Sequence, residues 1–512
     1  MTTSTIGILV IILLYLTMMV IVGFIFSKKN NNAGDYYLGG RKLGPFVTAM
    51  SAEASDMSSW LLMGLPGVAY LTGVADATWT AIGLAIGTYF NWLIVAKRLR
   101  KYTVKANNSI TIPDFFANRY HDKSKLLLAI SAIFIVIFFI PYTASGFAAC
   151  GKLFSTLFNI DYKIAMIISA IVIVAYTALG GFLAASTTDL IQSIVMTLAL
   201  IIVVFFGISN AGGVSAVIDN GKNLAGYLSL TSIHDAATGT AGSYGFITIL
   251  STLAWGLGYF GMPHVLLRFM AIEDDTKLKL SRRIATVWVV ISMGVAIFIG
   301  IIGNQLVNIG FITNLDDSEK ILIKVADLLS RHSFIGIVFA GIILAGILAC
   351  TMSTADSQLL AASSSISQNL LKETFGFKLT EKGGIIAARV TVLAIAVVSV
   401  FLAMDPNSSV FGIVSFAWAG FGAVFGPVML FSLFWKRSNK YGALAGMLSG
   451  GIMVFVWKYL VRPLGGVWNI YELLPAFIVA CIFIIVVSLL TPAPDESIVR
   501  EFEEINAECK AK

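Results

Sequence analysis

One stretch decides the fold: Ser51-Ala-Glu-Ala-Ser-Asp-Met-Ser-Ser-Trp60. Residues 45–71 are otherwise mostly apolar, and the carboxylates of Glu53 and Asp56 stand near the centre of that run. A carboxylate at the middle of a bilayer costs about 2.5–3.5 kcal/mol on insertion scales, so it usually faces a polar interior and has a function there. Gly64-Leu-Pro-Gly67 follows, and Gly and Pro weaken the helical hydrogen-bond ladder. The stretch therefore predicts a broken membrane helix with a transport site at the break.

Composition places the chain among membrane proteins. Of its 512 residues, 57% are hydrophobic and 12% are charged, and the mean hydropathy is +0.87. A soluble domain carries about 25% charged residues. The net charge of +7 comes from Lys and Arg in short loops, so it indicates membrane topology rather than nucleic-acid binding. The four cysteines lie far apart and show no metal or disulfide spacing.

The apolar runs predict an all-α polytopic membrane protein with about thirteen transmembrane helices, at about 20 residues per span. Residues 1–490 are expected to form one transmembrane transporter domain, and residues 491–512 a short polar tail. The 334–370 segment exceeds one span, so its end is expected to project from the membrane. The spans are placed at 6–26, 45–72, 77–96, 126–156, 164–180, 182–208, 243–262, 283–306, 334–370, 384–404, 410–434, 440–461 and 470–490.

Charge predicts the orientation of these spans. Most Lys and Arg fall in loops on one side, including Arg41 and a residue that we place in a loop after the seventh span, Arg268. The positive-inside rule then predicts a multi-pass protein of the cell (cytoplasmic) membrane, with its N-terminus outside and its C-terminus in the cytoplasm. Between the third and fourth spans, Thr111-Ile-Pro-Asp114 predicts a capping box that opens a short surface helix.

The interrupted second span has a counterpart in Trp255-Gly-Leu-Gly-Tyr-Phe-Gly-Met-Pro-His264. Two such segments at corresponding positions of two five-helix halves, 45–208 and 243–434, indicate an inverted-repeat transporter with its sites where the broken helices meet. The second segment also matches GxGxxG, but it lies in an apolar span without the βαβ context of a dinucleotide site, so nucleotide binding is not predicted.

The ninth predicted span contains Cys350-Thr-Met-Ser-Thr-Ala-Asp-Ser357. The hydroxyls of Ser353 and Thr354 fit two interpretations. Ser and Thr are common in contacts between membrane helices. Adjacent hydroxyls opposite an unwound helix also offer oxygen ligands for a hard cation such as Na⁺.

Besides Asp56, three carboxylates are predicted within or beside spans. Asp189 is either a helix-start residue near the inner surface or a functional group. Glu53 and Asp356 could pair with a cation, be protonated, or line a water path. Arg389 and His264 are available partners, but the sequence does not pair them.

Small residues at every fourth position predict close helix contacts rather than functional sites. No Ser/His/Asp arrangement or phosphate-binding loop is visible, so an enzyme is not predicted. A channel or sensor is disfavoured because no ring-forming pore motif or signalling module is seen. The small-residue positions are Gly83/Gly87, Gly422/Gly426 and Gly442/Gly446/Gly450.

Through these residues the chain resembles the sodium:solute symporter family, and within it the proline-transporting members, over nearly its whole length. The family has a broken-helix inverted-repeat fold. The matching stretches are Leu38–Phe46, Ala54–Ser58, Trp60–Gly67, Gly180–Ala184, Thr188-Asp189, Trp255–Gly261, Pro263-His264, Met352–Thr354 and Ala417–Ala423.

The resemblance implies uptake of L-proline together with Na⁺ as the co-transported ion; another amino acid or an organic acid, carried with Na⁺ or H⁺, is the alternative. It implies no partner beyond substrate, Na⁺ and the lipid bilayer, neither nucleic acid nor an obligate protein. The implied sodium ligands, between the second and ninth spans, are the carbonyls of Ala54, Met57 and Cys350 and the hydroxyls of Ser353 and Thr354.

The resemblance also assigns roles to other positions. Asp56 and Asp189 would couple transport to sodium, and Arg41 would lie at the cytoplasmic mouth. The substrate site would be lined by Ser58, Tyr142, Trp255, Tyr259 and Pro263, with Gly64 allowing close helix approach.

The chain departs from the pattern of the proline-transporting members at a few positions. We expect Gly where Glu53 and Ser59 stand, Gln at Met262, and a small neutral residue at Asp356. Met262 is next to the substrate-lining Pro263, so it bears on the substrate; the two carboxylates add titratable groups near the cation path.

Overall fold

The computed structural model describes residues 2–27, 32–378 and 380–510. Within these ranges, ten helices are long and apolar enough to cross a membrane, or eleven when one bent pair counts as a single span. The all-α polytopic class predicted from the sequence is confirmed. The count of thirteen stays a prediction, because two of the predicted spans coincide with shorter apolar helices, Trp60–Thr72 and Tyr162–Ala175.

The unbroken helices follow the predicted ranges closely. The predicted spans 164–180 and 182–208 are two helices that share the label α9 and meet at a kink at Gly181, where φ is 72°. Glycine adopts this backbone without the penalty that a Cβ would bring. The helices are α1 (Thr3–Ser27), α5 (Val74–Phe90) continued by η3 (Asn91–Val95) and α6 (Ala96–Lys105), α8 (Leu126–Phe158), α9 (Tyr162–Asn210), α13 (Leu278–Asn308), α15 (Phe334–Ser364) continued by η7 (Ser365–Thr374), α16 (Glu381–Leu402), α17 (Val410–Phe434), α18 (Lys440–Val456) continued by η8 (Trp457–Val461), and α19 (Leu473–Leu490).

Two spans are broken. The first consists of α3 (Pro45–Asp56), a break at residues 57–59, and then η2 (Trp60–Gly64) and α4 (Leu65–Thr72). The second consists of α11 (Phe246–Leu253), the 3₁₀ helix η4 (Ala254–Gly261) and α12 (Pro263–Ala271), with a bend of 46° before α12. Pro263 opens α12, where a helix does not need its N–H. The span therefore continues past its predicted end at residue 262.

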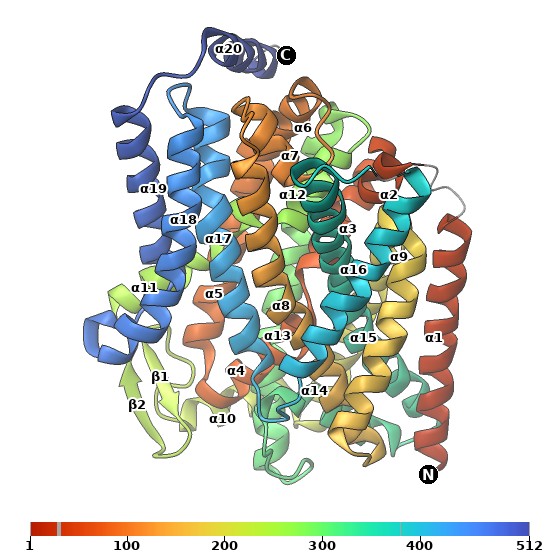
Figure 1. The fold of residues 1–512 in the computed structure, drawn as a ribbon. Helices are drawn as coiled ribbons and strands as arrows, with labels where there is room; N and C mark the ends of the chain where they lie inside the picture. Colours follow the sequence, from red (N-terminus) through yellow and green to blue (C-terminus); the bar gives the residue numbers. More distant parts are fainter. Residues whose placement is uncertain (1, 28–31, 379, 511–512) are drawn as a thin grey trace.

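The ends of the spans form two faces (Figure 1). The antiparallel pair β1–β2 was not predicted; it lies in the loop that follows α9. The predicted capping by Thr111 is confirmed, since its hydroxyl accepts from the Asp114 N–H at 3.1 Å. The hairpin face carries α10 (Gly213–Asn223), β1 (Ser232–Asp235), β2 (Thr240–Ser243), η6 (Ser318–Lys320), α14 (Ile321–Ser330), η9 (Arg462–Leu464) and η10 (Gly466–Trp468). The α20 face carries α2 (Ala33–Leu38), η1 (Gly39–Arg41), α7 (Ile112–Arg119), η5 (Asp275–Lys277) and α20 (Glu496–Lys510).

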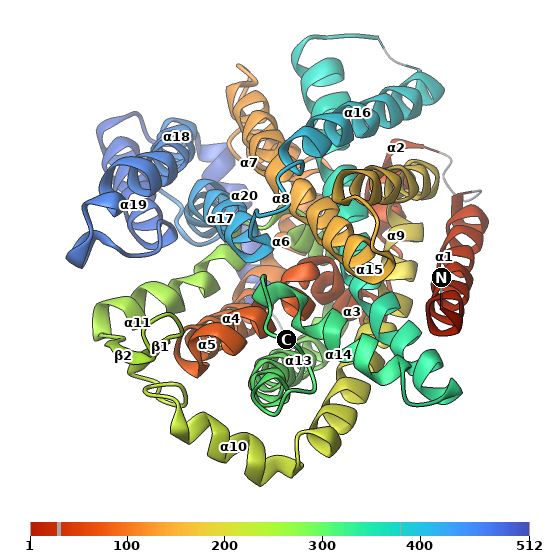
Figure 2. The same ribbon diagram turned by 90° about the horizontal axis from the view of Figure 1, so that it is seen from below.

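The breaks of both broken spans lie inside the bundle, whereas α11 lies at its edge (Figure 2). Helix α3 packs against α9, α12, α13 and α15, and η4 packs against α5 and α17. Helix α1 lies at the edge beside α9 and α15, while α18 and α19 pair at the opposite edge. This arrangement surrounds both breaks with protein on all sides, as non-helical backbone at membrane depth requires.

Small residues bring α5 and η4 into backbone contact. A Cβ on Gly87 would come 2.3 Å from the Gly256 carbonyl oxygen, and one on Gly83 would come 2.5 Å from the Leu253 carbonyl oxygen. Glycine is therefore required at these positions for close approach, which confirms the predicted role of the Gly83/Gly87 pair. The approach fixes η4 against a straight helix and so positions the second break.

We expect Gly87→Ala to destabilise the protein by about 1–3 kcal/mol, because the added methyl group overpacks this contact. Thermal unfolding in detergent should show a lower midpoint. Gly294→Ala is the matched control, since a Cβ there meets no atom within 4 Å. Equal midpoints for the two variants would contradict the packing argument.

Candidate functional site

The two breaks are joined through Asp56. Its side chain, the last in α3, accepts a hydrogen bond from the Tyr259 hydroxyl of η4 at 2.5 Å. Its backbone carbonyl accepts from Trp60 Nε1 at 3.2 Å and from the Tyr142 hydroxyl of α8 at 3.3 Å. The structure thus brings Asp56, Tyr142 and Tyr259, which the sequence placed in different roles, into one cluster.

A second cluster joins α3 to α15 through oxygen atoms. The Ser353 hydroxyl donates to the Ala54 carbonyl at 2.7 Å, and the Thr354 hydroxyl donates to the Cys350 carbonyl at 3.1 Å. Ser353 also lies 3.2 Å from the Cys350 carbonyl. Met57 is buried and directly follows α3. Carbonyl and hydroxyl oxygens gathered at a broken helix form a donor set suited to a small hard cation.

The carboxylate of Asp56 is only half satisfied. Its Oδ1 is buried and has no hydrogen-bond partner among the residues that the structure describes. An unpaired carboxylate oxygen is costly to bury, and intramembrane carboxylates typically mark ion pathways. This oxygen therefore supports a positive charge close to the first break.

Aromatic side chains enclose the space beside the second break. The Trp255 ring stacks on Tyr471 with centroids 5.1 Å apart, and it lies 5.4 Å from Phe411 and 6.4 Å from Trp60. Tyr471 precedes α19, outside every motif that the sequence indicated. These rings offer an apolar wall for a small ring or alkyl group.

Trp418 and the glycines near it determine how closely this wall packs. Trp418 Nε1 donates to the Trp255 carbonyl at 2.8 Å, and its ring meets that of Tyr259 edge-on at 5.0 Å. A Cβ on Gly258 would lie 1.9 Å from Trp418 Nε1, and one on Gly64 would lie 3.1 Å from Phe411 Cβ. Close approach of the second broken span to α17 therefore needs glycine at 258, and the approach of the first leaves only tight room for a Cβ at 64.

The remaining two substrate candidates lie at the breaks themselves. Ser58 is buried in the first break, and its Oγ is 3.5 Å from the Trp60 N–H. Pro263 is buried at the start of α12, immediately after the second break.

Asp189 lies in a different cluster, with Arg268. Arg268 Nη2 is 3.0 Å from Asp189 Oδ2, and both side chains are almost completely buried, at 1% and 0% exposure. The Ser51 hydroxyl donates to the same carboxylate oxygen at 2.6 Å and accepts from Arg268 Nε at 3.0 Å. Arg268 Nη2 also donates to the Ser357 hydroxyl. This ion pair connects α3, α9, α12 and α15.

The placement of Arg268 in a loop was wrong. The broken span continues through α12, so Arg268 lies inside the bundle and is the partner that the sequence could not identify. The proposed alternatives do not take this role: His264 has no hydrogen-bond partner at either ring nitrogen among the described residues, and Arg389 Nε bonds the Ala178 carbonyl at 3.0 Å. An apolar Pro-His-Val-Leu-Leu-Arg sequence after the break was the signal that could have shown it.

Glu53 and Asp356 are both buried and both keep one unpartnered oxygen within the described part of the chain. Glu53 accepts from Trp92 Nε1 at 3.0 Å, and Asp356 accepts from the Ser357 hydroxyl at 3.2 Å. Asp356 therefore adjoins the Arg268 cluster through Ser357, whereas Glu53 points toward η3.

Arg41 joins three segments on the α20 face. Its guanidinium donates to the Met270 carbonyl at 2.6 Å and to the Ser109 carbonyl at 2.8 Å. Arg100 similarly donates to the Ile272 carbonyl at 2.8 Å. The end of the second broken span is therefore tied to α6 and to the start of the first.

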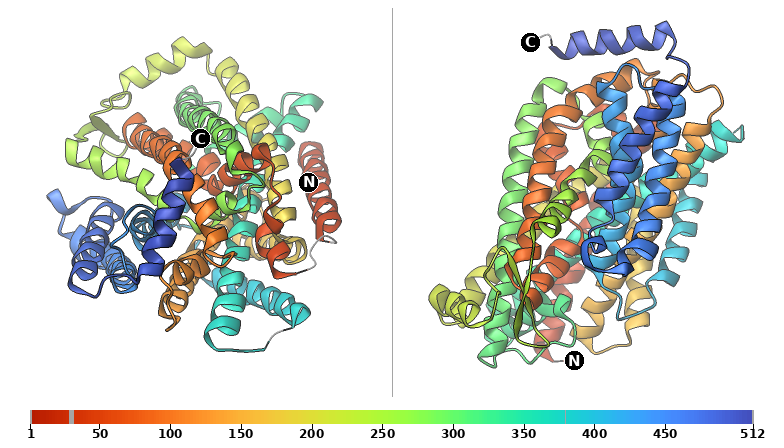
Figure 3. Two further views of the ribbon diagram at one scale, coloured as in Figure 1. Left: turned by 90° about the horizontal axis from the view of Figure 1, so that it is seen from above. Right: turned by 90° about the vertical axis from the view of Figure 1, so that its left-hand side faces the viewer.

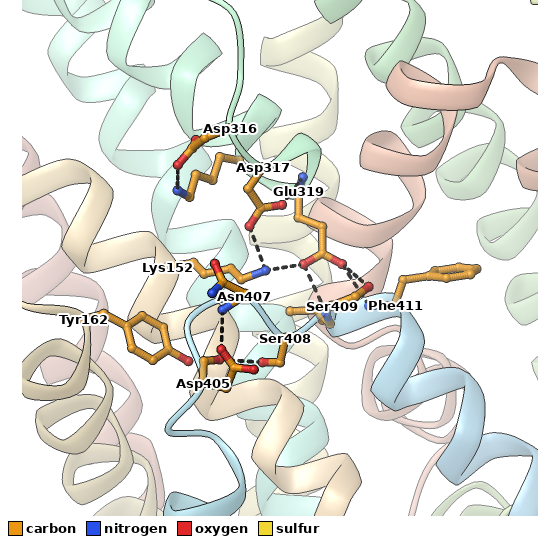
Figure 4. A network of polar contacts seen from close by, with 12 residues as sticks. Lys152, Tyr162, Asp316, Asp317, Glu319, Asp405, Asn407, Ser408, Ser409 and Phe411 are labelled. Atoms are coloured by element: carbon orange, nitrogen blue, oxygen red, sulfur yellow. Dashed lines mark hydrogen bonds and ion pairs between the residues drawn. The ribbon is translucent and has the colours of Figure 1, made fainter. Parts of the chain in front are cut away.

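On the hairpin face, a buried ion pair secures the segment between α13 and α15 (Figure 4). Lys152 Nζ of α8 is 2.7 Å from Glu319 and 2.8 Å from Asp317. The Glu319 carboxylate also accepts from the backbone N–H groups of Val410 and Phe411 at the start of α17, each at 3.0 Å. A carboxylate at a helix N-terminus is favoured by the helix dipole. Glu319 thus closes this face over α4.

These features define a class of protein. A bundle of apolar helices with two broken spans, whose breaks meet at a polar and aromatic centre, is a secondary transporter of the inverted-repeat type. Family comparison gives the particular family: the model of the sodium:solute symporter family matches residues 36–450, and the chain belongs to this family.

Relatives are similar over nearly their whole length. The chain is 43% identical to the sodium/proline symporter of Haemophilus influenzae, covering 96% of both chains. It is 41% identical to the sodium/proline symporter of Escherichia coli, covering 98% of this chain and 96% of the relative. It is 40% identical to the osmoregulated proline transporter OpuE of Bacillus subtilis, covering 96% of each.

Solved structures share the fold. A Na⁺-coupled sialic acid symporter, in a substrate-bound outward-open state, matches with a TM-score of 0.76 at 17% identity and covers 96% of this chain and 99% of its own. MhsT in complex with L-phenylalanine matches with a TM-score of 0.50 at 14% identity, covering 87% of this chain and 97% of its own. These likenesses confirm the transporter fold.

We expect Arg268→Met to destabilise the protein by about 3–5 kcal/mol, because it leaves the buried Asp189 carboxylate uncompensated. The double variant Arg268→Met/Asp189→Asn should recover part of that loss. Thermal unfolding of the two variants measures the difference. A double variant no more stable than the single one would contradict the ion pair.

Glu319→Ala should destabilise the protein by about 3 kcal/mol, because Lys152 then stays buried without its closest partner. Asp316→Ala is the control: Asp316 pairs with Lys320 at 2.8 Å but is 78% exposed, so its loss should be nearly neutral. Chemical unfolding measures the free energy of unfolding of the two variants. Equal stabilities would show that Glu319 does not secure this face.

Proposed function

We propose that this protein carries out sodium-coupled uptake of L-proline across the cell membrane. The observation that carries the proposal is the link between a cation-type oxygen cluster and a cluster of aromatic rings through one residue, Asp56. The full-length similarity to relatives named as sodium/proline symporters supports both the ion and the substrate.

The sodium ion is proposed to bind between α3 and α15. The ligands are the carbonyls of Ala54, Met57 and Cys350 and the hydroxyls of Ser353 and Thr354. Asp56 stays outside the ligand set, and its unpartnered Oδ1 adds negative potential close by. Because Tyr259 donates to its Oδ2, a cation at this site stabilises the position of the second broken span as well.

Proline is proposed to bind between the breaks. The rings of Trp255 and Tyr259 face the pyrrolidine ring, with Ser58, Tyr142 and Pro263 completing the site and Gly64 allowing the close packing. Asp189 couples to sodium indirectly, since it shares Ser51 and Arg268 with α3 and α12. Coupling by a differential affinity is reciprocal, so bound proline tightens sodium binding.

The α20 face is proposed to be cytoplasmic, because the Lys- and Arg-rich loops gather there. Arg41 then closes the cytoplasmic side, and Glu319 closes the outside. One positive charge moving inward gains about 2.3 kcal/mol per 100 mV of membrane potential, which supports accumulation of substrate of nearly two decades.

Radiolabelled proline uptake into proteoliposomes tests the function. We expect uptake under an inward Na⁺ gradient and none when K⁺ replaces Na⁺. Excess unlabelled proline should compete, and other amino acids or organic acids at the same excess should compete less. Uptake that ignores Na⁺, or that another solute blocks better than proline, would reject the proposal.

Ser353→Ala should raise the Na⁺ concentration for half-maximal uptake by about tenfold, the equivalent of about 1.4 kcal/mol for one lost oxygen ligand. Ser363→Ala is the matched control, because in the described part of the chain that buried hydroxyl of α15 bonds only the Leu360 carbonyl of its own helix. A Ser353→Ala variant with the same Na⁺ dependence as Ser363→Ala would remove this hydroxyl from the sodium site.

A further inference from the structure

Helix α20 lies crosswise over the ends of the spans and does not continue any of them (Figure 3). Its apolar residues Ile498, Phe502 and Ile505 are buried, and their spacing puts them on one side of the helix. The helix is thus docked on the folded protein by a hydrophobic stripe.

The rest of the contact is electrostatic. Carboxylates of α20 meet lysine ammonium groups and the imidazole of His121 on the surface below, at both edges of the stripe. The Lys105 ammonium also holds the pKa of the Glu504 carboxyl below its usual range. The pairs are Lys105–Glu504, Lys436–Glu503 at 3.2 Å, His121–Glu501 at 3.2 Å and Lys101–Glu508 at 3.8 Å.

Below the stripe lies a buried cation that the docked state satisfies only in part, since Arg119 Nε donates to the Ser432 carbonyl at 3.0 Å. Arg119 is fully buried, and its Nη1 and Nη2 have no hydrogen-bond partner in the described part of the chain. Its guanidinium is held among the rings of Tyr102, Tyr120 and Phe502, at 5.1, 5.0 and 5.4 Å. Phe502 belongs to α20, so lifting the helix would let water reach Arg119. Hydration of this charge on release would offset part of the lost apolar contact.

Docked α20 bridges two parts of the bundle. Arg98 of α6 donates to the Asn506 side chain of α20 at 2.8 Å and to the Leu433 carbonyl of α17 at 3.0 Å. On the other side, Glu503 reaches Lys436, which follows α17. The α20 helix therefore fastens α6 to the end of α17.

Fastening α6 affects the broken spans. Arg100 of α6 binds the Ile272 carbonyl that follows α12, and Arg41 binds both Met270 of α12 and Thr103 of α6. Any opening of the α20 face that moves α12 must therefore move α6 or break these bonds. A docked α20 resists that motion.

We propose that α20 is a salt-sensitive strap that docks on α6, α7 and the end of α17, slows opening of the α20 face, and is released when the ionic strength on that face rises. The regulatory part of this proposal rests on the proposed transport function and cytoplasmic placement of the α20 face. The docking of α20 on the bundle does not depend on the proposed transport function. Salt acts because the pairs are mostly exposed: the Debye length is about 10 Å at 0.1 M and about 3 Å at 1 M.

Docking is measured first, without transport. Spin labels at Ala507 of α20 and Lys123 of the α7–α8 loop report the distance between helix and surface in the full-length protein in nanodiscs. We expect one short distance at low KCl and a second, longer population at high KCl. A neutral sugar at equal osmolality should leave the short distance alone. One unchanged distance at every KCl concentration would overturn the salt-sensitive strap.

Charge variants separate release from misfolding. Glu504→Lys should release α20 at low salt, and Lys105→Glu/Glu504→Lys should restore docking with the charges exchanged. Glu496→Gln is the control, because this exposed residue of α20 has no ion pair among the described residues. Failure of the exchanged pair to restore the short distance would remove the Lys105–Glu504 pair from the strap.

Transport is measured second, in proteoliposomes with the α20 face inward. Raising KCl inside, at constant Na⁺ and osmolality, should raise the maximal uptake rate at least twofold. The variant Glu501→Gln/Glu503→Gln/Glu504→Gln/Glu508→Gln should already have the higher uptake rate at low KCl, and more KCl should not raise that rate further. If the labels report release while no proline is taken up, the proposed function fails and the docking stands. If uptake occurs but ignores both salt and the variant, the strap does not regulate and this inference fails.

Discussion

A broken helix inside a membrane exposes backbone carbonyls that no water can satisfy, and the core of this protein is built to supply donors for them. Ser353 donates to the carbonyl of Ala54, and Trp418 donates to that of Trp255. Asn91 donates to the Tyr259 carbonyl at 3.0 Å. Each donor comes from a neighbouring unbroken helix. The requirement to satisfy the breaks therefore decides which helices must surround them.

The same requirement explains why the charged residues lie where they do. Arg268 donates to the His264 carbonyl in its own broken span at 2.9 Å and pairs with Asp189 across the bundle. On the hairpin face, Glu319 satisfies the N–H groups at the start of α17 and pairs with Lys152. Arg268 and Glu319 thus each have a charged partner and a backbone partner, which offsets part of their desolvation cost. Asp56, Glu53 and Asp356 differ, because each keeps one carboxylate oxygen without a partner among the described residues, and that of Asp56 lies beside the oxygen cluster of α3 and α15.

Sequence reasoning located the breaks because they are local. Gly and Pro next to polar residues in an apolar run change the backbone wherever they occur, so both interrupted spans were predicted. It failed where an apolar run hid a long-range contact. Arg268 was placed in a loop because the run around Pro263 was read as the end of a span. Tyr471 was missed because nothing around it distinguishes a residue that stacks on Trp255 from any other tyrosine at the start of the predicted span 470–490.

The sequence by itself determined the class of protein, its helical character, the two broken spans and the family, because hydropathy, helix-breaking residues and motif identity act over short stretches of chain. Only the tertiary structure decided which polar groups meet: Asp56 with Tyr259, Asp189 with Arg268, and the acidic helix α20 with Lys105 and its neighbours. These pairs join residues far apart in the chain. Which residues pair depends on how the helices rotate and approach one another. The packing of the whole bundle sets that geometry, and a local sequence pattern carries no information on it.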